Sequence, residues 1–191
     1  MKTKSAVYDI TITAEFAAII AVCSWITIPI GEVPFTMQTF AVCCAAGLLG
    51  AKRGVTATLI YIILGAVGVP VFSGFRGGIG VIMGTTGGYI IGFLLTALCT
   101  GIFSDKFNKK LPALISGMVL GTLLCYTLGT AWYMVVYTAK TGAVGVSAVL
   151  MNCVVPFIIP DAAKISVAAF AVSRLKNIKY LSYAKASGTD E

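Results

Sequence analysis

The sequence predicts an all-α integral membrane protein, a single domain (residues 1–191) built as a bundle of six transmembrane helices. Of the 191 residues, 58% are hydrophobic and only 11% are charged. The mean hydropathy is +0.96, far above the range of soluble domains. Although the net charge is +7, the basic residues lie in short clusters between apolar stretches. That pattern is typical of membrane topology and argues against nucleic-acid binding.

The apolar stretches set the approximate bounds of the six spans. We expect them at residues 10–28, 35–50, 54–69, 79–103, 111–138 and 144–175. Pro156 and Pro160 should break the last span and leave a helix that starts near Asp161, because proline interrupts helical hydrogen bonding. The polar tail, residues 184–191, is expected to be disordered.

Small residues at four-residue spacing let membrane helices approach closely. They are Gly80, Gly84, Gly88 and Gly92 in the fourth span, Gly117 and Gly121 in the fifth, and two offset alanine pairs in the first, Ala14 with Ala18 and Ala17 with Ala21. For the glycines we expect packing within the bundle. For the alanines two interpretations stay open: packing inside the bundle, or contact with a partner subunit.

The basic residues indicate the orientation in the membrane. Eleven of the 14 fall before the first span, after the second, after the fourth and after the sixth. They are Lys2, Lys4, Lys52, Arg53, Lys106, Lys109, Lys110, Arg174, Lys176, Lys179 and Lys185. The side that carries them should be the cytoplasm, and an even number of spans then places both termini there.

Two charges, Asp161 and Lys164, interrupt the apolar part of the last span, residues 144–172. A charge at the centre of a membrane span costs about 2.5–3.5 kcal/mol on insertion scales, so it normally faces a partner, a cavity or a ligand. Three residues apart on a helix, the two side chains share one face. They could grip a small polar molecule. The alternatives are purely structural roles: Asp161 caps the helix after Pro160, and Lys164 only pairs with Asp161.

Three stretches bring further polar and aromatic residues to the predicted outer end: residues 32–39, 70–89 and 152–164. A mostly apolar pocket with a few polar groups is the usual form of a small-molecule site. Arg76 could meet a ligand carboxylate or a lipid headgroup. Thr36 and Gln38 could bind a ligand or only hold a loop. Trp132 could line the pocket or lie at the membrane interface.

Several function classes are excluded or disfavoured. The chain has no His, and none of its six cysteines forms a C-x-x-C pair, so no metal site is expected. We find no catalytic constellation and no phosphate-binding P-loop motif. The chain is therefore not expected to be an enzyme, to hydrolyse ATP or to carry a cofactor.

Several ordered motifs resemble the biotin-specific substrate-binding (S) component of energy-coupling-factor (ECF) transporters, the BioY family. They are Val33–Thr39, Ala46–Gly50, Gly68–Phe72, Gly84–Tyr89 and Pro156–Lys164. The likeness covers about residues 10–175. One departure is Thr85, where the family often has proline.

The resemblance implies a multi-pass protein of the prokaryotic cell membrane that captures biotin with high affinity at the outer face. It also implies two cytoplasmic ATPase subunits, joined through a transmembrane coupling subunit. The alanines of the first span (Ala14, Ala17, Ala18 and Ala21) would dock on that coupling subunit. An S component for another vitamin and a solitary ion-coupled carrier remain alternatives.

The resemblance also suggests roles for individual residues. Asp161 would accept a hydrogen bond from the ureido N–H of biotin, and Lys164 or Asn152 would donate one to its carbonyl. The carboxylate of biotin would lie near Arg76 or the glycine-rich loop. The other expected contacts are Phe35, Thr36, Gln38, Phe72, Thr86, Gly87, Tyr89 and Trp132.

Overall fold

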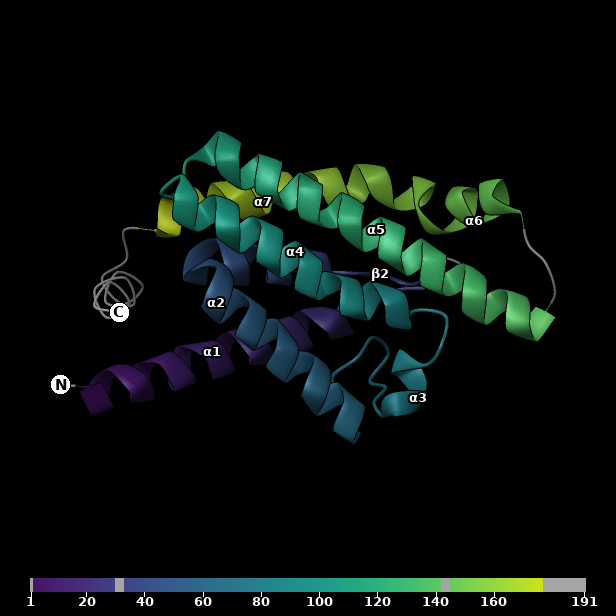
Figure 1. Cartoon of the computed structure of the whole chain (residues 1–191), viewed down its shortest axis with the longest axis horizontal. Coiled ribbons are helices and arrows are strands. Elements are labelled where there is room, and N and C mark those ends of the chain that lie inside the picture. Colours follow the sequence, from purple (N-terminus) through teal and green to yellow (C-terminus); the bar gives the residue numbers. More distant parts are fainter. Residues whose placement is uncertain (1, 30–32, 142–144, 177–191) are drawn as a thin grey trace.

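The chain forms a helical bundle in the computed structural model, which describes residues 2–29, 33–141 and 145–176 (Figure 1). The helices are α1 (Lys2–Trp25), α2 (Gln38–Val67), α3 (Ile79–Ile82), α4 (Gly87–Lys106), α5 (Leu111–Thr141), α6 (Val146–Cys153) and α7 (Val155–Leu175). Two short strands, β1 (Thr27–Ile28) and β2 (Phe35–Thr36), pair antiparallel. The predicted disordered tail lies outside the described residues.

Helix α2 is bent sharply and supplies two of the six predicted spans. Gly50 interrupts its helical conformation with a φ of 83°, a left-handed value that glycine adopts without steric penalty. The chain reverses direction at this point, so the two arms lie against each other and Gly54 packs on the backbone of Ala46. Counting both arms, with α6 and α7 as one broken span, confirms the predicted six-helix bundle.

The fourth span begins later than predicted. Residues 79–82 form the separate helix α3, and α4 starts only at Gly87. A Cβ atom on Gly87 would collide with the carbonyl of Ile82, so the chain folds back tightly between the two helices. The prediction of one continuous helix from residue 79 was therefore wrong.

The break in the last span lies at Val154, before the two prolines (φ −125°, ψ −54°). Pro156 lies in the first turn of α7, where the missing N–H is not needed, and Pro160 is accommodated inside the helix. The prediction of a helix starting near Asp161 was wrong. So was the capping interpretation, because Asp161 lies almost two turns into α7.

Helix α2 lies centrally and contacts α1, α4 and α7, while α5 packs along α4 and also contacts α7 (Figure 1). Glycines allow α4 and α5 to approach closely. Added Cβ atoms on Gly88, Gly92, Gly117 and Gly121 would meet Trp132, Cys125, Phe103 and Thr96, respectively. The packing prediction is confirmed for these four glycines. It was wrong for Gly80 and Gly84, which precede α4.

The alanines of α1 divide between two faces. Ala17 and Ala21 are buried in the core, whereas Ala14 and Ala18 are exposed. The structure thus corrects the prediction that all four form one docking surface.

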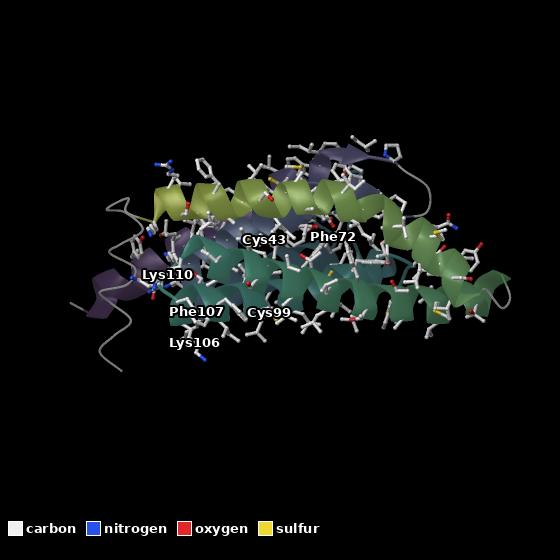
Figure 2. The ribbon with its side chains drawn as sticks, turned by 90° about the horizontal axis from the view of Figure 1, so that it is seen from above. Cys43, Phe72, Cys99, Lys106, Phe107 and Lys110 are labelled. Carbon is white, nitrogen blue, oxygen red and sulfur yellow. The ribbon has the colours of Figure 1, made fainter. Side chains whose placement is uncertain are left out.

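The bundle has two distinct ends. The start of α1, the bend of α2, the α4–α5 turn and the end of α7 lie together at one end, and α3 and α6 lie toward the other (Figure 1). Figure 2 shows Lys106 and Lys110 at the first end and Phe72 well removed from them. We call these the basic end and the opposite end.

Candidate functional site

A cavity of about 80 Å³ lies among α2, α4, α5, α7 and the loops of the opposite end. Eight of the predicted binding residues line it: Thr36, Gln38, Phe72, Arg76, Thr86, Tyr89, Asp161 and Lys164. Most of the remaining lining is apolar and includes Phe93 and Phe157. The cavity has the usual composition of a small-molecule site, an apolar wall with a few polar groups.

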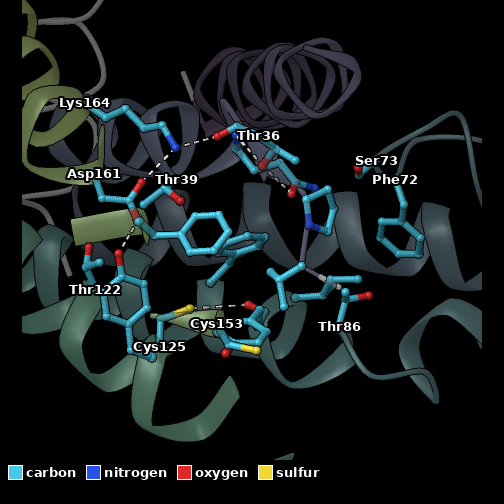
Figure 3. A pocket seen from close by; sticks show the side chains of 18 of the residues that line it. Thr36, Thr39, Phe72, Ser73, Thr86, Thr122, Cys125, Cys153, Asp161 and Lys164 are labelled. Atoms are coloured by element: carbon cyan, nitrogen blue, oxygen red, sulfur yellow. Dashed lines mark hydrogen bonds and ion pairs between the residues drawn. The ribbon is translucent and has the colours of Figure 1, made fainter. Parts of the chain in front are cut away.

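The polar part of the wall is a connected network around Asp161 (Figure 3). The Lys164 Nζ donates to Asp161 Oδ1 at 2.8 Å and to the carbonyl of Thr36 at 2.6 Å. The Tyr126 hydroxyl donates to Asp161 Oδ2. The network therefore joins α7 to both α5 and β2.

Asp161 and Lys164 are only 5% and 7% exposed. Burial of single charges is costly unless they are paired and hydrogen-bonded. Here both conditions are met, and the Lys164 ammonium also lies 3.8 Å from the centre of the Phe35 ring, where the ring quadrupole attracts a cation. The pair is thus held in one geometry before any ligand arrives.

A second set of hydrogen bonds fixes the segment that follows β2. The Thr36 hydroxyl donates to Gln38 Oε1 at 2.9 Å, and Gln38 Nε2 donates to the Tyr61 hydroxyl. Gln38 is 5% exposed. These bonds hold the Thr36 carbonyl where Lys164 reaches it.

The loop between α2 and α3 forms another side of the cavity. Phe72 and Arg76 exchange backbone hydrogen bonds, and the Phe72 ring meets Tyr61 edge-on at 5.6 Å. The Trp25 indole N–H donates to the Pro70 carbonyl at 2.9 Å, which ties the loop to α1. Arg76 is exposed, so its guanidinium lies where the cavity meets the surroundings.

Four predicted binding residues lie outside the lining. Phe35 packs beneath Lys164, and Gly87 is confined by the Ile82 carbonyl. The Trp132 indole N–H donates to the Gly84 carbonyl at 3.0 Å. Asn152 is exposed on α6, and its neighbour Cys153 lines the cavity instead. This geometry does not support a ligand contact for Asn152.

The family model of the BioY family matches residues 1–180. The chain belongs to the BioY family. It is 40% identical to "Biotin transporter BioY" of Thermotoga maritima over 86% of this chain and 93% of that protein. It is 38% identical to "Probable biotin transporter BioY" of Pyrococcus horikoshii, over 88% and 96% of the two chains.

A solved structure supports the same assignment. The chain superposes on the crystal structure of "the S-component for biotin from an ECF-type ABC transporter" with a TM-score of 0.83 and 26% identity. The match covers 96% of this chain and 98% of that one. These relatives are transporters, so membership in the BioY family agrees with the prediction that the chain is not an enzyme.

In this BioY chain, the sequence prediction named Trp132 on α5 but missed the α5 residues that line the cavity. Thr122, Cys125 and Tyr126 all line the cavity. Their spacing of three and four residues places them on one face of a helix, and Thr122 and Tyr126 add polar groups to an otherwise apolar span. That spacing was the available signal.

Proposed function

We propose that this BioY chain binds biotin in the cavity and, as the S component of an ECF transporter, mediates high-affinity biotin uptake. The observation that carries the proposal is the buried Asp161–Lys164 pair, which is fixed by Tyr126 and Thr36 in an otherwise mostly apolar wall. The names of the relatives support biotin as the ligand.

The polar network keeps unused hydrogen-bonding capacity for a ureido ring. An ammonium has three donors and an ionised carboxylate about four acceptor positions. Lys164 uses two donors, and each oxygen of Asp161 accepts one bond. Asp161 can therefore accept from a ureido N–H while Lys164 donates to the ureido carbonyl, and the ion pair stays intact.

The rest of the ligand would occupy the apolar part of the cavity. Phe72, Tyr89, Phe93 and Phe157 line it and would pack against the thiophane ring and the valeryl chain. The exposed Arg76 would meet the carboxylate, for which a guanidinium provides paired donors.

Partner subunits would supply the energy. We propose a transmembrane coupling subunit and two cytoplasmic ATPase subunits, as the ECF context of the structural relative suggests. On α1, Ala14 and Ala18 are exposed and available for docking, whereas the buried Ala17 and Ala21 are not. The basic end would face the cytoplasm of a prokaryotic cell with both termini, so the cavity would open near the outer face.

Biotin binding by the purified, detergent-solubilised chain tests the proposal. We expect Asp161→Asn and Lys164→Ala each to weaken affinity about tenfold or more, roughly 1.4 kcal/mol. Asn152→Ala is the matched control and should bind as wild type does, because Asn152 is exposed and outside the cavity. A folded wild type that does not bind biotin would refute the proposal.

Two further outcomes would favour a different function for this chain. Displacement of biotin by another vitamin at equal concentration would favour an S component with a different ligand. Uptake that persists without the ECF ATPases but collapses with the proton gradient would favour the solitary ion-coupled carrier.

A further inference from the structure

Thr122 carries a polar group that nothing in the described structure explains. It lies on α5, is 5% exposed and lines the cavity. Its Oγ1 is shielded from solvent and has no hydrogen-bond partner among the described residues. A buried hydroxyl without a partner is costly, and such groups are rare in native proteins.

Other threonines of this chain show what a helix ordinarily does with a buried hydroxyl. Thr13, Thr58 and Thr96 each donate to the carbonyl four residues earlier. This local bond is the common fate of threonine inside membrane helices. Thr122 does not make it among the described residues, so the ligand-free chain leaves a hydroxyl of a cavity-lining residue without a partner.

The position of Thr122 shows which part of a ligand it would meet. It lies one helical turn before Tyr126, whose hydroxyl donates to Asp161. Figure 3 shows Thr122 on the same side of the cavity as Asp161 and Lys164, with Phe72, Ser73 and Thr86 on the other side. Arg76 belongs to that other side, because its Nε donates to the Ser73 carbonyl at 3.2 Å.

We propose that the Thr122 hydroxyl is a direct ligand contact that hydrogen-bonds the urea group of the ligand beside Asp161. The inference rests on the proposed function and extends it to a residue on α5. A urea offers one carbonyl and two N–H groups, and a hydroxyl can donate to the first or accept from the second. Thr122 on α5 and Asp161 on α7 thereby hydrogen-bond the same urea group.

Biotin titration of Thr122→Val, Thr122→Ser and Thr100→Val tests this contact. Valine keeps the shape of threonine and removes the hydroxyl. The Kd of biotin for Thr122→Val should therefore rise roughly three- to tenfold, which is the effect of one lost hydrogen bond. Serine keeps the hydroxyl and should stay within about twofold of wild type. Thr100 is the matched control: it is a fully buried threonine on α4 that lies outside the cavity lining. Thr100→Val should bind as wild type does.

Thermal unfolding of the ligand-free proteins separates binding from folding. Thr122→Val should unfold at the same temperature as wild type or higher, because it removes an unsatisfied buried group. The loss should also persist with biotinamide, whose neutral amide replaces the carboxylate expected near Arg76. Wild-type affinity in Thr122→Val, or an equal loss in Thr100→Val, would overturn the contact and leave the proposed function intact. A wild type that fails to bind biotin would instead remove the proposed function and the contact together.

Discussion

Asp161 combines two tasks at a single residue. One carboxylate oxygen accepts from Lys164 on the same helix and the other accepts from Tyr126 on α5. The same bonds that stabilise a buried charge therefore also fix the distance between α5 and α7. A ligand that binds Asp161 meets an acceptor whose position is already determined, and pre-organisation of this kind lowers the cost of binding.

Tyr126→Phe should weaken biotin binding about tenfold or more. The substitution keeps the ring and removes a hydrogen bond to a charged group, a bond worth about 1.5–3 kcal/mol. Asp161 would then be held by Lys164 alone. The measurement is the Kd of biotin in detergent, and Tyr137→Phe on the same helix is the control. Tyr137 lies outside the cavity lining, and its ring stacks on Tyr133 at 5.2 Å. Equal affinities for Tyr126→Phe and wild type would show that Tyr126 does not position the carboxylate.

The bend of α2 shows how one element depends on another. Asp105 on α4 accepts from the Ala51 N–H at 2.9 Å, at the start of the second arm. Ser104 donates to the Gly47 carbonyl at 2.7 Å, and Lys109 donates to the Leu48 carbonyl at 2.6 Å, at the end of the first arm. Each charge has the sign that suits the helix end it meets. The bend is thus capped by side chains from α4 and the turn after it.

Local signals in the sequence predicted the two arms of α2 but not these caps. Apolar length and the Lys52–Arg53 pair mark the ends of the arms, whereas the capping residues lie more than 50 positions further along the chain. Pro156 and Pro160 led to a wrong prediction of where the last helix begins. Helix α7 continues through Pro160 and the break falls at Val154, which brings Cys153 rather than Asn152 to the cavity. The caps of α2 are tertiary contacts, whereas the break at Val154 lies directly before a helix that carries Pro156 in its first turn.

Gly50→Ala should destabilise the protein clearly. A φ of 83° strains any residue with a Cβ, at a cost of about 1–3 kcal/mol, and the new Cβ would also collide with the Asp105 carboxylate. Gly80→Ala is the control. Gly80 lies in helix α3, and a Cβ there would meet nothing within 4 Å. Thermal unfolding in detergent should show a lower midpoint for Gly50→Ala and little change for Gly80→Ala. Equal midpoints for the two variants would mean that the bend tolerates a side chain.

The whole molecule separates its clustered basic residues from the cavity along its long axis (Figure 2). At the basic end, Lys106 ends α4, and Lys109 and Lys110 lie in the turn to α5. The ion pair between Arg53 and Asp9, at 2.8 Å, ties α1 to the second arm of α2. The cavity and its loops lie toward the opposite end. A bundle built in this way has a preferred orientation, because clustered basic residues resist translocation across the membrane.

Cysteine labelling in intact cells should reveal that orientation. Phe75 is 64% exposed in the loop beside the cavity, so Phe75→Cys should react with a membrane-impermeant maleimide added outside. Lys110→Cys, in the turn at the basic end, should react only after the cells are permeabilised. The wild-type protein measures the background labelling of the six native cysteines. These cysteines all lie in helices, namely α1, α2, α4, α5 and α6. The reverse labelling pattern would place the cavity on the cytoplasmic side, and capture of biotin from outside would then be impossible in this conformation.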